Sequence, residues 1–336
     1  MLWILIIMMI GIYCSDYSIQ SLKFLRRTLN DYNIKHLVNN DLNDKSIDFI
    51  LVLGGDKAVR NYFHKSINSD IPVLGINDSE ESGFLSQIEL KEFISYIGRI
   101  KKNDYTVENI PRIGVKIDRK NLQSVLNDVA VFPSKCAVLM EHILRINNEE
   151  VWHDSSDGII VSTPLGSSAY SMSAGGPIIF HESPVFGIVS VNSLNITRRP
   201  LIVSNSSHVL IDDISARLHC EVILDGLTRY KVKKTVECIK YLPSAHIIRM
   251  KKNSTTITAL EKKVHLAKDL LKMPPSSKLL LKTMEYEGMI TQKELARKTL
   301  LPLRTIRLSL RQLLEKGYIK KKISTRDSRQ KTYEIS

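Results

Sequence analysis

A continuous apolar run from Ile47 to Leu53 ends directly in Gly54-Gly55-Asp56. Unbroken runs of Ile, Leu and Val of this length are typical of strands covered on both faces, as in parallel sheets flanked by helices. The segment from Lys57 to Ser66 is the helix expected to follow. This stretch therefore predicts an α/β fold with a tight strand-to-helix turn.

The elements around this strand repeat the same alternation. An amphipathic helix is expected from Tyr17 to Tyr32, and another around Glu89 to Lys102. Short apolar strands are expected at Met9 to Tyr13, Ile34 to Val38 and Ile71 to Ile76. The β-α-β order predicts an open sheet, and such sheets bind ligands at the carboxyl ends of their strands.

The apolar start of the chain is too short to span a bilayer and carries neither a basic region nor a small-residue cleavage site. The cysteines at positions 14, 136, 220 and 238 form no C-x-x-C pair and no zinc pattern with histidines. We therefore expect no signal, no anchor and no structural metal. Scattered thiols of this kind indicate the reducing cytoplasm.

The Gly54-Gly55-Asp56 turn is the first candidate site. Two glycines let a phosphate chain approach the backbone, and the Asp56 carboxylate could accept a proton from an attacking hydroxyl or hold Mg²⁺. The triplet alone is a weak signal, because a tight turn with a solvated aspartate has the same sequence.

The stretch from Asp157 to Pro177 is the second candidate. Its first half, Ile159 to Val161, is a buried strand that Pro164 ends. From Gly166 to Gly176 the residues are Gly, Ser and Ala apart from Tyr170 and Met172, so backbone N–H groups and hydroxyls could be open to a ligand. Tyr170 could lie against a flat ring. The alternative is a small-residue turn packed tightly on a sheet.

Several motifs, taken together, resemble the NAD kinase family over Met9 to Met250. The long S-A-Y-S-x-S-A-G-G-P run is the most specific of them, whereas Gly-Gly-Asp also occurs in lipid kinases and phosphofructokinases. The motifs in chain order are Gly54-Gly55-Asp56, Gly75-Ile76-Asn77, Gly83-Phe84-Leu85, Asn127-Asp128, Asp157 to Pro177 and Asp225-Gly226.

The resemblance implies an N-terminal α/β domain (residues 1–103) and a β-sandwich domain (residues 104–255). It also implies an NAD site between them that is completed across a subunit contact, so we expect a homo-oligomer, a dimer or tetramer. The implied enzyme phosphorylates the 2′-hydroxyl of the adenosine ribose of NAD, using ATP or polyphosphate with Mg²⁺, and gives NADP.

The resemblance also assigns roles to individual residues. Asp56 is the implied catalytic base, in a turn formed with Gly54, Gly55 and Lys57. Asn127 and Asp128 match the pair that holds the adenosine, and Asp157 matches the aspartate that reaches the nicotinamide ribose side. The remaining residues implied to line the dinucleotide are Phe84, Ser168, Ala169, Tyr170 and Ser173.

The chain departs from the family pattern in five changes. Lys57 stands where the family has glycine, so a side chain and a cation enter the turn, where they could touch phosphate or fill the pocket. The other departures are Asp128 for Glu, Leu165 for a hydroxyl residue, Val191-Asn192 for Pro-His and Leu227 for Gln. They leave a second hypothesis open: a weak or inactive NAD kinase-like sensor that regulates transcription by binding DNA.

The last 61 residues have a different character. Residues 276–336 carry fifteen Lys and Arg against six Asp and Glu, whereas the whole chain has a net charge of +13. A linker helix is expected over residues 256–275, ending at Pro274-Pro275. Three further helices (Ser277 to Tyr286, Thr291 to Lys298 and Leu303 to Lys316) and a β-hairpin resemble a winged helix-turn-helix domain.

This basic domain is expected to bind duplex DNA. Arg304, Arg307 and Arg311 share one side of the third helix, while Leu303, Ile306, Leu310, Leu313 and Leu314 pack the other. The hairpin wing offers Lys320, Lys322, Arg326, Arg329 and Lys331 to phosphates. The alternative is a basic domain that binds another protein.

Overall fold

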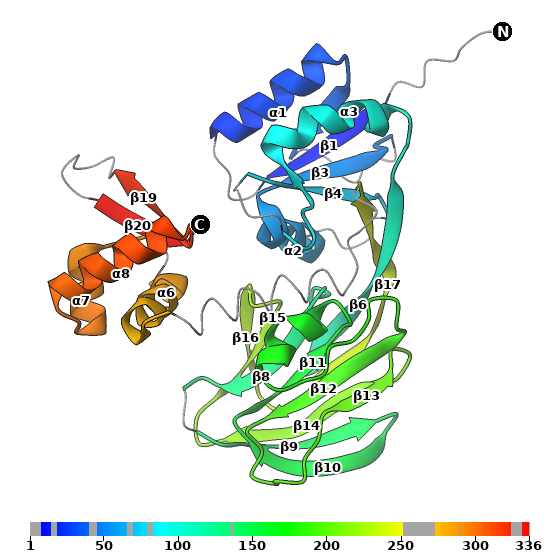
Figure 1. Cartoon of the computed structure of the whole chain (residues 1–336). Helices are drawn as coiled ribbons and strands as arrows, with labels where there is room; N and C mark the ends of the chain where they lie inside the picture. The colour runs from blue at the N-terminus through cyan, green and yellow to red at the C-terminus, as the bar shows by residue number, and fades with distance from the viewer. Residues whose placement is uncertain are drawn as a thin grey trace. The chain divides into compact units, whose positions relative to one another are not determined.

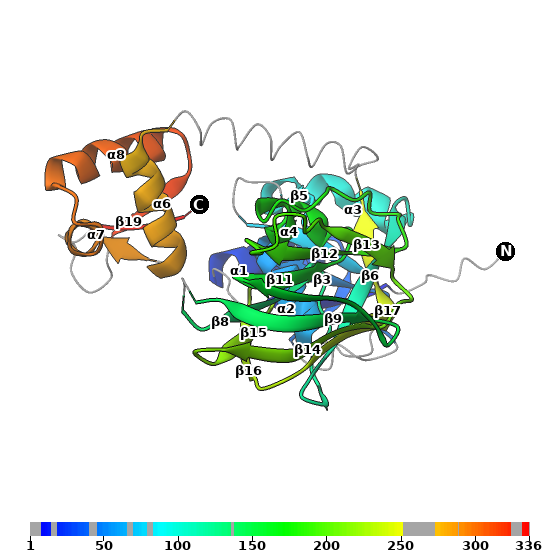
Figure 2. The same ribbon diagram turned by 90° about the horizontal axis from the view of Figure 1, so that it is seen from below.

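The computed structural model describes residues 8–14, 19–39, 46–65, 70–78, 83–135, 138–250, 273–287, 289–323 and 331–335 (Figures 1 and 2). The chain divides into two compact units. The first contains every described element up to strand β17, and the second begins with helix α6.

The first unit opens with a parallel α/β layer. Strands β1 (Met9–Cys14), β2 (Lys35–Val38), β3 (Phe49–Leu53) and β4 (Val73–Asn77) lie in the order β4-β3-β1-β2, with β5 (Ile88–Glu89) beside β4. Every residue of β3 is buried. Helices α1 (Ile19–Asp31) and α3 (Phe93–Lys101) cover one face of this layer, and α2 (Gly55–Lys65) covers the other (Figure 1). A 3₁₀ turn, η1 (Leu90–Glu92), leads into α3.

Two long strands extend this sheet into the second layer. Strand β17 (Val236–Arg249) pairs with β6 (Thr106–Ile117) along most of its length, while Ile247 lies beside Val73 of β4. At its other end β17 pairs with β14 (Val209–Ala216), which continues to β9 (Met140–Ile146) and β10 (Glu149–Ser156). The short strand β7 (Lys120–Asn121) returns along β6.

A second, antiparallel sheet packs on this extension and forms the sandwich. Its order is β13-β12-β11-β8-β15-β16. The strands are β8 (Asp128–Pro133), β11 (Gly158–Ser162), β12 (Val185–Val191), β13 (Leu201–Ser204), β15 (Cys220–Leu224) and β16 (Thr228–Val232). Buried side chains of both sheets, among them Val129, Leu144 and Phe186, make one core between them.

The second unit has three helices and a small sheet. Helices α6 (Pro275–Glu287), α7 (Gln292–Thr299) and α8 (Leu303–Glu315) enclose a core that includes Leu280, Leu295 and Leu310. Strands β18 (Ile290–Thr291), β20 (Lys331–Ile335) and β19 (Ile319–Ile323) form an antiparallel sheet in that order. Thr291 caps α7 in a capping box with Glu294.

The predicted fold class, an α/β layer, a β-sandwich and a winged helix-turn-helix, is confirmed. Ahead of β8, which begins at Asp128, Val125 makes only an isolated bridge to Ile113. The domain limits at residues 103 and 255 stay a prediction. The linker helix falls mostly outside the described residues.

Two further expectations concern membranes and thiols. Within the described ranges, no helix combines the length and the apolar character that a membrane crossing needs. Cys14, Cys220 and Cys238 are buried thiols, as expected, and burial raises the pKa of Cys238 to about 12. Cys136 lies outside the described residues.

Candidate functional site

Asp56 lies at the carboxyl end of β3, in the first turn of α2. The backbone reaches this turn through Gly54 (φ 119°) and Gly55 (φ 72°), conformations that side chains with a Cβ rarely adopt. The next residue along the chain, Lys57, is exposed and is not among the positive-φ residues. Its side chain therefore does not fill the turn, and its backbone does not require glycine.

The Asp56 carboxylate is held by backbone donors. Oδ2 accepts the N–H of Phe84 at 2.8 Å, and Oδ1 accepts those of Leu85 and Ser86, both at 2.9 Å. A Cβ on Gly83 would come within 2.1 Å of Oδ1, so the 83–86 segment can approach this closely only with glycine there. Since an ionised carboxylate offers about four acceptor positions, one remains for a ligand hydroxyl.

Asp225 ties α2 to the start of β8. Its Oδ1 accepts the backbone N–H of Asn127 at 2.7 Å and of Asp128 at 3.1 Å, while Oδ2 accepts that of Leu126 at 3.0 Å. Oδ2 also lies 2.9 Å from Nε2 of His64, in the last turn of α2. The Asp225 side chain has no exposed surface. This buried carboxylate therefore fixes the backbone that carries the predicted adenosine pair.

Asp128 is buried beside this carboxylate. Burial raises its pKa, the negative charge of Asp225 raises it further, and the result is about 7. Two weaker effects act in the opposite direction, the positive charge of Arg60 and a hydrogen bond from the backbone of Tyr170. Arg60 follows Asp56 by four residues on α2, so the two side chains lie on the same face of that helix.

The turn after β11 packs directly against Asn127. A Cβ on Gly166 would come within 1.9 Å of the Asn127 carbonyl oxygen, so this contact requires glycine. Thr163 donates its backbone N–H to the same oxygen at 2.9 Å and its hydroxyl to the Leu126 carbonyl at 2.5 Å. The two candidate stretches of the sandwich thus form one rigid edge.

The small-residue segment then makes two short helical turns, η2 (Gly166–Ser168) and α4 (Tyr170–Ser173). Ser168 is buried and donates its hydroxyl to the Leu165 carbonyl at 3.2 Å, whereas Ser173 is exposed and Ala169 is partly exposed. Tyr170 was expected to lie against a flat ring. In the structure it stacks on Phe132 at 5.6 Å between ring centroids and remains 44% exposed.

Phe84 is half-buried beside a charged cluster from β6 and β17. Its ring meets His181 edge to face at 4.8 Å, and its carbonyl accepts Nη1 of Arg249 at 2.8 Å. Arg249 in turn donates Nε to Glu108 at 2.5 Å. The loop that holds Asp56 is therefore anchored to the long strands that join the two layers.

Asp157 is not brought together with these residues. It precedes β11, where it accepts Nδ2 of Asn192 at 2.8 Å. Asp128 pairs in register with Ser162, at the opposite end of the same strand. Five residues of extended strand separate Asp157 from Ser162, a distance of roughly 16 Å.

The structure describes some of the residues that are predicted to bind DNA. Arg304, Arg307 and Arg311 are exposed on α8, and Arg311 donates to Glu315 at 2.7 Å. Lys320 is half-buried in β19 and Lys331 is exposed in β20. Arg326 and Arg329 lie outside the described residues, as does the side chain of Lys322.

The predicted packing face of α8 is confirmed for most of its residues. Ile306, Leu310 and Leu313 are buried, and Leu314 packs against them in part. The prediction is wrong for Leu303, which is 45% exposed. This residue begins the helix, so it lies at the edge of the core, where no neighbouring element covers it.

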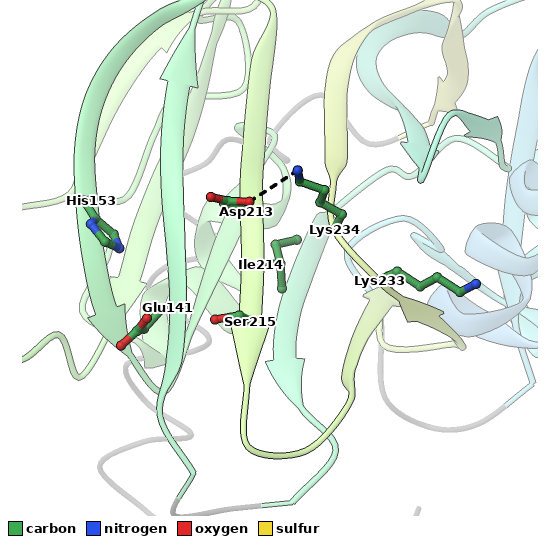
Figure 3. Close-up of a pocket in the computed structure, with 7 residues that line it drawn as sticks. All are labelled: Glu141, His153, Asp213, Ile214, Ser215, Lys233 and Lys234. Carbon is green, nitrogen blue, oxygen red and sulfur yellow. Dashed lines mark ion pairs between the residues drawn. The ribbon is translucent and has the colours of Figure 1, made fainter.

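A separate cavity lies on the sandwich (Figure 3). It has a volume of about 410 Å³ and is lined by Glu141, His153, Asp213, Ile214, Ser215, Lys233 and Lys234. Lys234 reaches Asp213 at 3.5 Å, but both side chains are about two-thirds exposed (68% and 64%) and Lys233 points away. Exposed ion pairs of this kind contribute little to stability, so we assign this cavity no role.

Metal ligands are not clustered in the described parts of the chain, where no group of three or more His, Cys, Asp and Glu side chains could hold an ion. The sequence analysis did not mark two residues of the site, Arg60 and His64, and it named a third, Asp225, only as part of a family motif without a role. The Asp225-Gly226 pair carried a turn signal, since both residues have positive φ (52° and 68°) between β15 and β16. Nothing local marked Arg60 or His64.

Family comparisons cover most of the first unit and part of the second. Residues 13–105 match the ATP-NAD kinase N-terminal domain, and residues 126–242 match the ATP-NAD kinase C-terminal domain. Residues 275–320 match a family described as winged helix-turn-helix DNA-binding.

Individual proteins agree with these matches. The chain is 30% identical over 219 residues to the NAD kinase of Methanopyrus kandleri, covering 65% of this chain and 78% of that one. It is 32% identical over 197 residues to the NAD kinase of Heliobacterium modesticaldum, covering 57% and 69%.

Two solved structures share the fold. An NAD kinase from Archaeoglobus fulgidus in complex with ATP superposes with a TM-score of 0.65 at 23% identity, over 77% of this chain and 99% of that one. Yeast NADH kinase complexed with NADH gives 0.63 at 19% identity, over 74% and 85%.

Proposed function

Because the chain belongs to the NAD kinase family and is an enzyme, a kinase, we propose that it converts NAD to NADP by phosphorylating the 2′-hydroxyl of the adenosine ribose. ATP is the proposed donor, with polyphosphate as an alternative. The observation that carries this proposal is the Asp56 carboxylate, which three backbone N–H groups orient at the end of β3.

Asp56 acts as the general base. It accepts the proton of the 2′-hydroxyl as that oxygen attacks the γ-phosphorus and the bond to the departing ADP oxygen breaks. The backbone donors use three of its acceptor positions and fix its direction, so the remaining position faces the hydroxyl without reorganisation. Positioning of this kind supplies much of the rate in phosphoryl transfer.

Asn127 and Asp128 hold the adenosine. Their backbone is fixed by Asp225 and by the contact with Gly166, which supports a rigid cradle for the ribose and base. The cofactor-binding role proposed for Ser168, Ala169, Tyr170 and Ser173 rests on the family resemblance and on their segment, which begins at this edge with Gly166. For Phe84 it rests on the resemblance and on its place in the loop that holds Asp56. Asp157 lies at the far end of β11, which supports a role toward the dinucleotide of a neighbouring subunit in a homo-oligomer.

Mg²⁺ is proposed to accompany the nucleotide. Mg²⁺ usually binds through one or two carboxylates together with substrate phosphates, and it neutralises phosphate charge in the reaction. The backbone donors leave Asp56 one acceptor position, and this position is assigned to the hydroxyl, so the carboxylate would not bind the ion directly at the same time. The donor set is sparse, so most of the ligands come from the nucleotide and water.

An assay for NADP formation by the purified full chain, with ATP and Mg²⁺, tests the proposal. We expect activity in the wild type and a loss of orders of magnitude in Asp56→Asn, with NAD binding retained. Asp213→Asn, an exposed carboxylate, is the matched control. Equal rates in Asp56→Asn and wild type would disprove the assignment of the base.

An inactive wild type that still binds NAD would favour the second hypothesis, a nucleotide sensor. Lys57→Gly then tests whether the cation at this turn is responsible. A gain of activity assigns the block to Lys57, whereas no gain assigns it to the other departures, Asp128, Leu165, Val191-Asn192 and Leu227. A cytoplasmic location is part of the proposal in either case, since both hypotheses depend on intracellular nucleotides.

The second unit is proposed to bind duplex DNA. The three exposed arginines of α8 would contact base edges, and the lysines of the wing would contact phosphates. We expect binding by the full chain, measured by fluorescence anisotropy, to fall steeply with salt. Arg304→Ala or Arg307→Ala should weaken binding and any sequence preference, whereas Lys231→Ala, an exposed change on β16, should do neither. Absence of duplex binding at low salt would reject this role.

A further inference from the structure

A cavity of about 660 Å³ lies between the last turn of α2 and strands β6, β7 and β17. Its polar lining includes His64, Arg112, Lys116, Gln123, Ser124 and Tyr241. None of the proposed catalytic or dinucleotide-binding residues lines it. Asp56 starts α2, whereas His64 ends it, so about 12 Å of helix separates the two.

Arg112 is buried at this cavity with most of its donors unused. The side chain is 1% exposed, and its guanidinium lies over the rings of Phe63 (5.3 Å) and Tyr241 (4.8 Å). Nη2 donates to the Phe63 carbonyl at 2.7 Å, but Nε and Nη1 have no partner. A guanidinium has five N–H donors, and unsatisfied buried donors are costly.

Two more lining residues carry unpartnered buried atoms. Ser124 is 4% exposed, and its hydroxyl has no partner. His64 uses Nε2 for Asp225, and its other ring nitrogen, Nδ1, has no partner. Polar atoms from α2, from β6 and from the segment after β7 thus converge on one cavity. Buried polar groups are nearly always satisfied in native proteins, so such a group of exceptions indicates a ligand.

The charge of the lining defines the chemistry of this ligand. Arg112 and Lys116 are both cationic, and the lining that the described residues form contains no carboxylate. The nearest acidic partners lie outside the lining: Glu237 reaches Lys116 at 3.6 Å, and Asp225 lies behind His64. Each unpartnered N–H of a buried guanidinium can donate a strong, charge-assisted hydrogen bond to an oxyanion.

We propose that this cavity is a second binding site, for a small metabolite that carries a phosphate or carboxylate group. The unpartnered N–H groups of Arg112 donate to the oxyanion, the Ser124 hydroxyl adds a further donor, and Lys116 adds charge from its partly exposed position. The volume exceeds that of a bare ion and lies in the range of small-molecule sites.

This site is coupled to the adenosine edge through His64 and Asp225. His64 contacts Asp225 through Nε2, so a ligand bound to the other ring nitrogen, Nδ1, acts on the same imidazole ring. Asp225 in turn holds the backbone of residues 126–128. Occupancy therefore changes the affinity for NAD, and by linkage NAD changes the affinity for the second ligand equally.

Isothermal titration calorimetry of the full chain, with inorganic phosphate in one arm and citrate in the other, tests the proposal. We expect saturable binding of at least one of them. Arg112→Gln should weaken it about tenfold or more, and Lys116→Ala by a few-fold. Ser124→Ala removes only the hydroxyl donor, so it provides a second test if Arg112→Gln fails to fold. The control Lys120→Ala changes an exposed residue of β7 outside the lining and should leave binding unchanged.

The same titration in the presence of saturating ATP separates the two sites. Binding that persists with ATP, and is lost in Arg112→Gln or weakened in Ser124→Ala, supports the proposal. Competitive displacement by ATP would identify the anion as an occupant of the donor site and overturn it, as would binding that neither variant weakens or no binding of either anion. Because calorimetry needs no turnover, a failure of NADP formation leaves this test intact.

Discussion

Replacing Asp225 with asparagine should destabilise the first unit more than any other single-atom change in the site. The carboxylate accepts three backbone N–H groups and faces His64, all in the interior. An asparagine keeps one oxygen, which can serve Asn127 and Asp128. Its amide group then faces the N–H of Leu126, so two donors oppose each other.

The magnitude follows from these contacts. An orphaned buried N–H costs about 1–3 kcal/mol, and each of the two remaining bonds falls from the charged to the neutral range, a loss of about 1 kcal/mol each. His64 can change tautomer and accept from the new amide, which recovers part of the loss. Relief of the repulsion between Asp225 and Asp128 offsets a further part. We expect a net loss of about 2–4 kcal/mol in the free energy of unfolding.

Urea unfolding followed by circular dichroism measures this loss. Asp213→Asn is the matched control, because Asp213 is 64% exposed and has a positive φ (52°) that asparagine tolerates. It should change the free energy of unfolding by less than about 0.5 kcal/mol. A loss below about 1 kcal/mol in Asp225→Asn would refute the view that this carboxylate holds the adenosine edge.

Three further predictions concern other parts of the chain. The folded pKa of Asp128 (about 7) is above its ordinary value of 3.8, so the folded state binds more protons between these limits. The free energy of unfolding should therefore fall as pH rises from about 4 to about 7, by up to about 4 kcal/mol. Asp128→Asn should remove this component of the pH dependence. Identical pH dependence of the free energy of unfolding in the variant and the wild type would contradict this prediction. Gly166→Ala places a Cβ 1.9 Å from the Asn127 carbonyl oxygen and should reduce both thermal stability and NAD binding. The control Gly98→Ala changes a helical site with nothing within 4 Å and should stabilise the protein by up to about 1 kcal/mol. Equal melting temperatures of Gly166→Ala and the wild type would argue against the close contact. Thr291→Ala removes the capping box of α7 and should destabilise the second unit by about 1 kcal/mol in thermal unfolding, with NADP formation unchanged; a change in activity without one in stability would contradict this.

The sequence determined what depends on neighbours in the chain. The apolar run into Gly54-Gly55-Asp56 specified a buried strand, a left-handed turn and a helix, because burial on both faces and positive φ each require particular residue types. The same holds for the capping box at Thr291 and for the helix order of the second unit. The long motif from Asp157 to Pro177 pointed to the family and hence to Asn127 and Asp128.

Only the tertiary structure decided which distant residues meet. His64 and Asp225 are 161 residues apart, and no local pattern links them. Strands β6 and β17 carry one sheet through both layers, an arrangement that periodicity cannot specify because it depends on which edges pair. Tertiary packing also decided that Tyr170 stacks on Phe132 and that Leu303 remains exposed. Packing across the fold, rather than spacing along the chain, sets the partner of a ring or a buried charge.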